Sequence, residues 1–282
     1  MSGFPLPRPD FRRIALLVAL LLAGLATRAA AVTVSPSALF IDSRSRTGTL
    51  TLYNGGTLPE EVEVSFAFGY PVSDSVGTIN VELRDTASSG EPSIVPWLRA
   101  FPRRLVLQPG QRQVLRVLVQ PPADLAEGEY WGRVLVRARG GQPPIEQTNG
   151  DVRVQLNVET VIATALMFRK GAVETGITVQ DARAETTPEG VQLTVDVARQ
   201  GTAAYLGRVR AQLVSPDGRV QAEVEDAVAV YRTLRRRFVF PAPAGGLRPG
   251  YTVRYTFDTE RPDLPAAGPV RAAPVAGAVA VR

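Results

Sequence analysis

Short runs in which hydrophobic and polar residues alternate recur along the chain from Val32 onward. Glycine, proline, asparagine and aspartate separate these runs, as at Asn54-Gly55-Gly56 and Gly140-Gly141. An alternation with a period of two places apolar side chains on one face of a β-strand, and the separating residues favour tight turns. No long stretch of this region repeats with the period of a helix. The pattern therefore predicts an all-β protein of antiparallel strands.

The first half of this region contains enough strands for one complete β-sandwich. Their spacing suits a sandwich of about seven strands. Trp97 and Trp131 fall within this half, and such large aromatic side chains are expected in its core. The expected strands are 32–41, 47–54, 61–68, 79–83, 105–107, 113–119, 128–139 and 152–168.

A second domain is expected to begin near Arg169-Lys170-Gly171, where one apolar run stops and a new alternation follows. We predict two immunoglobulin-like antiparallel β-sandwich domains, over residues 32–170 and 171–260. The segment 261–282 is rich in proline and alanine, and it either ends in a strand at 278–281 or forms a tail. The other strands expected in the second domain start at 177 and then cover 191–197, 207–214, 220–224, 233–240 and 251–258.

The segment 152–168 is unusually long for a single strand, because strands typically contain about 5 or 6 residues. Val152, Val154, Leu156 and Val158 fall on one side of it and polar residues on the other. One interpretation is a long strand that both pairs with a partner protein and leads into the next domain. The alternative is two ordinary strands, divided near Thr160.

The first 31 residues have the features of a secretory leader. Three arginines precede an apolar run over 14–26, and the small residues Ala29, Ala30 and Ala31 follow. The run is shorter than the roughly 20 residues that a membrane-spanning helix needs. We therefore expect cleavage after Ala31, export to the periplasm and no transmembrane segment after leader removal. An uncleaved anchor is the alternative.

The charge balance does not favour nucleic acid as a partner. The whole chain has 32 basic and 27 acidic residues, of which the leader holds four and one, so leader removal lowers the net charge from +5 to +2. A nearly balanced charge provides no electrostatic footprint for a polyanion. We expect no nucleic-acid partner.

The chain contains no cysteine and no histidine. Disulfides, thiol nucleophiles, thiolate or imidazole metal sites and histidine-dependent triads are therefore excluded. Paired carboxylates could still support glycosidase chemistry or bind calcium, but each acidic group lies beside an expected turn or strand end, where a solvated carboxylate is usual. These groups are Glu60-Glu61, Glu223, Glu225-Asp226 and 258–263. We expect no enzyme activity, no catalytic residues, no metal and no cofactor.

Several segments of the first domain together resemble a known family. They are Ala31-Val32-Thr33-Val34 leading to Leu39-Phe40-Ile41-Asp42, the strand 49–54, Leu107-Gln108-Pro109-Gly110-Gln111 with Leu115-Arg116-Val117, the Tyr130-Trp131 strand and the alternating strand over 152–158. In order and spacing, mainly over 31–170, they resemble the periplasmic chaperones of pilus and fimbria assembly.

The resemblance implies two immunoglobulin-like domains set at an angle, which hold unfolded or incomplete pilin-type subunits. Such a subunit lacks its last strand and has an open sheet edge, which makes it prone to aggregate. The chaperone would add a strand to that edge, with the side chains of Val152, Val154, Leu156 and Val158 filling the subunit groove. An outer-membrane usher is a further implied partner.

In the family, an arginine on the first strand and a lysine near the end of the long strand bind the terminal carboxylate of the subunit. Ala38 and Ala165 occupy the corresponding positions here and carry no charge. Arg169 and Lys170 are close enough in sequence to form a displaced carboxylate anchor. The alternative for this pair is an ordinary solvated position at a domain junction.

A second interpretation of function stays open at this point. The chain could be an exported structural or adhesive β-sandwich module that binds a folded envelope protein or a surface polymer.

Overall fold

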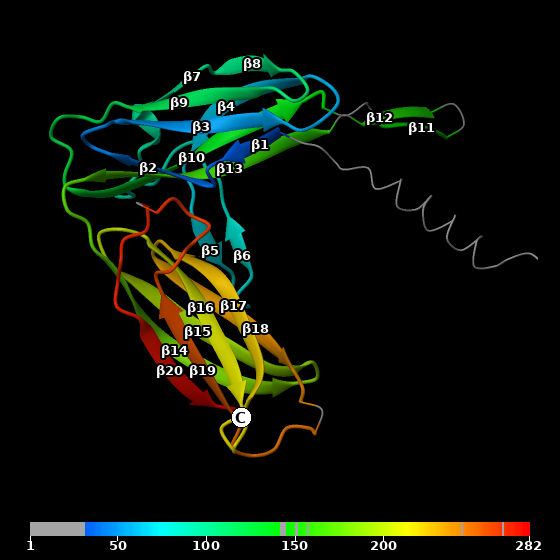
Figure 1. Ribbon diagram of the computed structural model, residues 1–282, viewed down its shortest axis with the longest axis vertical. Coiled ribbons are helices and arrows are strands. Elements are labelled where there is room, and N and C mark those ends of the chain that lie inside the picture. Colours follow the sequence, from blue (N-terminus) through cyan, green and yellow to red (C-terminus); the bar gives the residue numbers. More distant parts are fainter. Residues whose placement is uncertain (1–31, 142–144, 150–151, 157, 244, 267) are drawn as a thin grey trace, which may run out of the picture.

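The computed structural model describes residues 32–141, 145–149, 152–156, 158–243, 245–266 and 268–282, with the backbone alone for 145–149 and 152–156. The expected leader, residues 1–31, lies outside this range. Apart from one short 3-10 helix, η1 (Val95–Trp97), all regular elements in these ranges are strands. They form two β-sandwiches, one after the other along the chain (Figure 1). The predicted all-β, two-domain immunoglobulin-like fold is confirmed.

The first sandwich consists of a four-stranded sheet in the order β1-β3-β9-β7 and a five-stranded sheet in the order β2-β13-β10-β4-β8. Apolar residues from both inner faces fill the space between the sheets, and Leu50, Leu115 and Val134 are completely buried there. The strands are β1 (Val32–Ser35), β2 (Ala38–Asp42), β3 (Thr47–Asn54), β4 (Glu60–Ala67), β7 (Leu98–Phe101), β8 (Arg104–Leu107), β9 (Arg112–Val119), β10 (Gly128–Arg139) and β13 (Glu159–Lys170).

The segment 32–41, expected as one strand, is two strands in different sheets. β1 pairs with β3 in the four-stranded sheet, whereas β2 runs parallel to β13 in the five-stranded sheet. The break falls at Pro36, which lacks a backbone N–H for a sheet ladder. A similar change of sheet occurs at Pro102, between β7 and β8, and sequence analysis missed β7.

A hairpin of β5 (Pro71–Ser73) and β6 (Ile79–Val81) extends from the first sandwich to the second (Figure 1). The backbone N–H of Arg235 donates to Ser73 Oγ at 2.7 Å, and Arg235 Nη1 donates to the carbonyl of Ser75 at 2.8 Å. Ile79 packs against the core of the second sandwich. The hairpin therefore joins the two domains away from the covalent linker.

The second sandwich combines a three-stranded sheet, β14-β15-β18, with a four-stranded sheet, β17-β16-β19-β20. Val195, Val209 and Phe257 are among the completely buried residues between them. The last strand of the chain pairs with β19, so the segment after 260 contributes to this sandwich. The strands are β14 (Thr175–Thr187), β15 (Gly190–Gly201), β16 (Tyr205–Val214), β17 (Val220–Val230), β18 (Thr233–Pro241), β19 (Thr252–Asp258) and β20 (Val275–Ala280).

A buried cluster connects the two sandwiches. Trp131 from β10 meets the ring of Tyr231 edge to face, with 4.8 Å between ring centroids. Beside them, the buried Glu129 accepts hydrogen bonds from the Trp131 indole and from the backbone N–H of Ala204, both at 2.9 Å. Trp131 is buried as expected, but it lies between the domains rather than inside one sandwich. An apolar contact with a satisfied carboxylate holds the domains together.

Candidate partner-binding edge

The segment 152–168 is divided into two strands. β12 (Val152–Leu156) ends before Asn157, which lies outside the described residues, and β13 begins at Glu159. The two-strand alternative from the sequence describes this arrangement, with the break a few residues before Thr160. β12 pairs antiparallel with β11 (Ile145–Asn149), a strand that sequence analysis missed, and this hairpin projects from the end of the first sandwich (Figure 1).

Of the four expected partner-strand residues, the structure describes the side chain of one. Val158 is 51% exposed, next to the start of β13. The side chains of Val152, Val154 and Leu156 lie outside what the structure describes. Their backbone belongs to β12, which leads directly toward β13.

β13 has a neighbour on one side along its whole length and on the other side along only part of it. It pairs with β10 from Glu159 to Lys170, but with β2 only from Ala165 to Arg169. Residues 159–164, here called the open edge, therefore have no strand on that side within the described part of the chain. Such an edge has unpaired backbone donors and acceptors and can pair with a strand from another chain.

Apolar side chains are exposed along the open edge. Ile162 faces the core, whereas Val161, on the opposite face of the strand, is 45% exposed. Ala163 is exposed on that same face. The open edge thus combines free backbone groups with exposed apolar surface, which are the two requirements for adding a strand from a partner.

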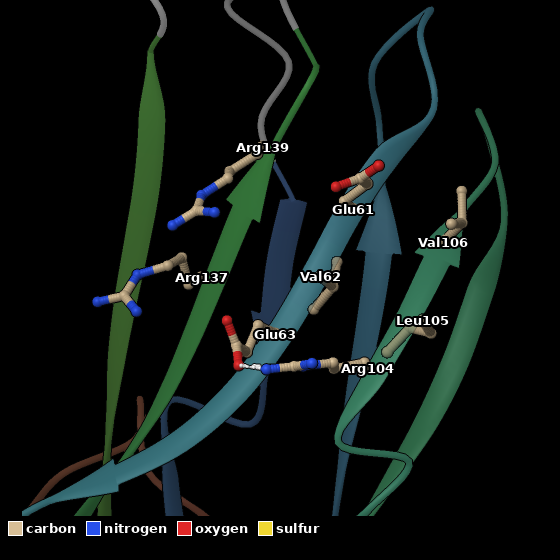
Figure 2. A pocket seen from close by; sticks show the side chains of 8 residues that line it. All are labelled: Glu61, Val62, Glu63, Arg104, Leu105, Val106, Arg137 and Arg139. Carbon is tan, nitrogen blue, oxygen red and sulfur yellow. Dashed lines mark hydrogen bonds and ion pairs between the residues drawn. The ribbon is translucent and has the colours of Figure 1, made fainter.

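A groove of about 500 Å³ lies on the outer face of the same sheet, over β8, β4 and β10 (Figure 2). Arg104 donates to the Glu63 carboxylate at 2.8 Å across it, and this bond lowers the pKa of Glu63. Arg137 and Arg139 from β10 both pair with Glu159, at the start of the open edge. The lining residues are Glu61, Val62, Glu63, Arg104, Leu105, Val106, Arg137 and Arg139.

Arg169 and Lys170, the expected carboxylate anchor, both have partners within the chain. Arg169 Nε donates to Glu129 at 2.8 Å, and its guanidinium lies over the Phe40 ring. Lys170 Nζ donates to the carbonyls of Ala123 and Leu125. These contacts use the two cations to connect elements of this chain.

Ala38 and Ala165 lie opposite each other in the register of β2 and β13, and Arg133 of β10 lies opposite Ala165. The three residues form a row across adjacent strands, on the face that meets the second domain. Arg133 is 8% exposed, and its Nε donates to the carbonyl of Gly69 at 3.0 Å. No carboxylate within the described ranges lies at ion-pair distance from it. A buried, unpaired guanidinium strongly favours an anion beside it.

Arg133 was not among the site residues expected from the sequence. On β10 it alternates in phase with Arg137 and Arg139, so that it resembles one more solvated arginine on an outward face. Only packing in the folded protein buries it, so the sequence carried no signal for it.

The fold and this edge define a class of protein: a two-domain β-sandwich with one partly unpaired strand beside the domain junction. No family model matches the chain, and no curated protein matches its sequence. Among solved structures, a complex of the SafA pilin with the SafB chaperone from Salmonella enterica is similar with a TM-score of 0.44 and 15% identity, covering 90% of this chain and 99% of that one.

Two further solved structures are similar over most of both chains. The Pseudomonas aeruginosa CupB2 chaperone has a TM-score of 0.39 and 13% identity, covering 88% of this chain and all of that one. The CsuC–CsuE complex of a chaperone with a tip adhesion subunit, from Acinetobacter baumannii, has a TM-score of 0.42 and 11% identity, covering 89% of this chain and 98% of that one. The likenesses concern architecture.

Proposed function

We propose that this protein is a periplasmic chaperone that holds pilin-type or other incomplete envelope subunits, here called clients, by pairing its open edge with theirs. The observation that carries the proposal is the unequal pairing of β13, whose first half has a neighbour on one side only within the described residues. A client that lacks a strand has the complementary defect, an unpaired edge over an open core. Pairing the two edges would give hydrogen-bond partners to the backbone groups of both.

The segment before the open edge supplies the side chains for this interaction. In a client complex, Val152, Val154, Leu156 and Val158 would extend the pairing and enter the apolar groove of the client. Burial of each side chain is worth roughly 1.5 to 3 kcal/mol before the cost of association is subtracted. β12 would then exchange its pairing with β11, or add the client to its other side.

Arg133 is the best candidate for binding a terminal carboxylate of the client. It lies beside Ala165, one strand away from the positions where the resemblance implies basic residues. Arg169 and Lys170 remain candidates for the same role, although each would have to release a partner within the chain. A client carboxylate at Arg133 would instead supply a missing counter-charge.

Function in the periplasm requires export, for which the segment 1–31 has the features of a cleaved leader. The part of the chain that the structure describes holds no helix long and apolar enough to span a membrane. An outer-membrane usher would be the next partner, since a held subunit must be passed on.

The test introduces negative charges into the segment 152–158 of this protein, which is proposed to pair with the client. Leu156→Asp with Val158→Asp should abolish the recovery of a soluble complex with a pilin-type subunit, because two carboxylates would have to enter an apolar groove. Complex formation is measured by co-purification from the periplasm, and folding by circular dichroism. Val220→Asp, on the exposed end of β17 in the second domain, is the matched control and should leave recovery unchanged.

Undiminished capture of the subunit by the folded double variant would contradict strand donation by this segment. Stable binding to an already folded envelope protein, with no effect on unfolded subunits, would instead support the alternative of a structural or adhesive module.

A further inference from the structure

Glu60, the first residue of β4, is an unusual acidic residue. The sequence predicts that Glu60 and Glu61 are solvated, but Glu60 is 3% exposed. Its Oε1 is buried without a hydrogen-bond partner among the described residues. Burial raises the pKa of Glu60 above its usual value, and no charged group of the described chain acts against that shift. An isolated buried carboxylate is costly unless a cation or further donors accompany it.

Burial is opposed by the backbone N–H of Val32, whose hydrogen bond to the Glu60 carboxylate lowers the pKa of that group. Val32 is the first residue of β1, is 2% exposed and is held in register opposite Asn54 of β3. On another side the carboxylate is enclosed by Gly141, where an added Cβ would lie 2.6 Å from Glu60 Oε1. The nitrogen of Val32 therefore already lies where a cation could reach the carboxylate.

The chemistry of leader removal would change that nitrogen. Hydrolysis by a leader peptidase adds water across the Ala31–Val32 peptide bond, giving a carboxylate on Ala31 and an amine on Val32. An α-amino group has a pKa of about 7.7 to 8.0 and carries a positive charge at neutral pH. One amide donor would thus become an ammonium group with three donors and a full charge.

We infer that Glu60 is the receptor for the new N-terminus: cleavage after Ala31 leaves the α-ammonium of Val32 ion-paired with the Glu60 carboxylate, which fixes β1 in the sandwich. The inference rests on the export proposed above. It adds that removal of the leader stabilises the first domain. The uncleaved chain keeps a buried carboxylate with one amide donor, so its first sandwich is less stable than that of the cleaved chain.

The first measurement is the intact mass and N-terminal sequence of the protein purified from the periplasm of an expressing host. Val32 is the expected first residue. A start at Ala30 or Ala31 would overturn the inference while leaving export intact. Retention of the leader in the cytoplasm would count against both the inference and the proposed export.

The second measurement is a double-mutant cycle on the chain that starts at Val32. Adding one alanine before Val32 should reduce the ratio of folded to unfolded protein by at least about tenfold, because the charge moves away from Glu60. In a Glu60→Gln background the same addition should change the ratio by less than about twofold. Equal effects in both backgrounds would overturn the inference. Glu61→Gln, next to it on β4, is the matched control and should behave as the parent chain.

A third readout needs no variant. The reaction rate of the Val32 amine with acetic anhydride, followed against pH by mass spectrometry, should give a pKa above that of an ordinary α-amino group. An ordinary value would mean that the ion pair is absent.

Discussion

The two sandwiches differ in how they treat an edge strand. β13 in the first domain has an open edge on which Val161 is exposed, and Val158 is exposed beside it. β17 is the edge of a sheet in the second domain, and three of its six exposed residues are acidic, namely Glu223, Glu225 and Asp226. Of these, Glu225 pairs with Arg208 and Arg210, at 3.2 and 2.9 Å. Charged side chains along an edge are a common protection against unwanted pairing.

The two domains also differ in how arginines near these strands are paired. Three arginines, Arg208, Arg210 and Arg236, form ion pairs with carboxylates of β17. Arg133, near the inner end of β13, has none within the described part of the chain. The edge at β17 is therefore lined by its own ion pairs, whereas residues 159–164 of β13 leave backbone groups without a partner strand within the described chain. This asymmetry supports the proposed partner site in the first domain.

The largest effect is expected from removing the unpaired cation. Arg133→Met should weaken binding of a client with a free terminal carboxylate by about tenfold to a hundredfold, since a hydrogen bond to a charged group is worth roughly 1.5 to 3 kcal/mol. Titration calorimetry measures the affinity for the C-terminal peptide of a client, once with a free and once with an amidated terminus. Amidation should remove the difference in affinity between variant and parent.

The control for this prediction is Arg116→Met, on the exposed face of the other sheet of the same domain, which should bind as the parent does. Equal loss in both variants, or an Arg133→Met variant that still distinguishes the two peptides, would remove Arg133 from the site.

A smaller effect is expected from removing the charges that protect β17. Glu223→Val with Glu225→Val should create a second apolar edge, so that the protein self-associates through its second domain. The free energy of unfolding should change by less than about 1 kcal/mol, because these ion pairs are exposed. Analytical ultracentrifugation checks the association. A strictly monomeric double variant would indicate that the acidic residues do not protect this edge.

The smallest effect is expected from lowering the pH through the pKa of Glu225. The hydrogen bond from Arg210, together with the charge of Arg208, lowers the pKa of Glu225. The folded-state pKa of Glu225 is therefore below its unfolded-state pKa, so the ion pairs of Glu225 stabilise the folded protein. This stabilisation is complete above the ordinary glutamate pKa of about 4.3 and is lost as the pH falls through the lowered pKa. Light scattering should therefore show weak self-association below about pH 4. Glu225→Gln should move the same association to neutral pH, and an unchanged pH profile in that variant would argue against the mechanism.

Elements with strict alternation between clear turns were predictable from the sequence. β3 and β10 coincide with the expected ranges 47–54 and 128–139, because each has one regular apolar face and lies between glycine-rich or polar turns. The short strands β5, β7 and β11 were missed. Strands of three to five residues carry too few alternations to be recognised without their neighbours.

The candidate site was partly predictable. The alternation of 152–158 pointed to the segment that leads into the open edge, and Val158 is exposed beside that edge. The open edge itself was not predictable, since it exists because β2 begins at Ala38 and pairs with only the second half of β13. Glu60 and Arg133 were missed for a related reason: each resembles its solvated neighbours in the sequence, and only packing buries it.

The sequence by itself determined the class of fold, the two domains and the absence of thiol and imidazole chemistry, because periodicity and residue types are local properties. Only the tertiary structure decided which strand edge stays open and which charges are buried. Those properties depend on pairing between segments far apart in the chain, and alternation specifies which face of a strand is apolar but not which strand lies beside it.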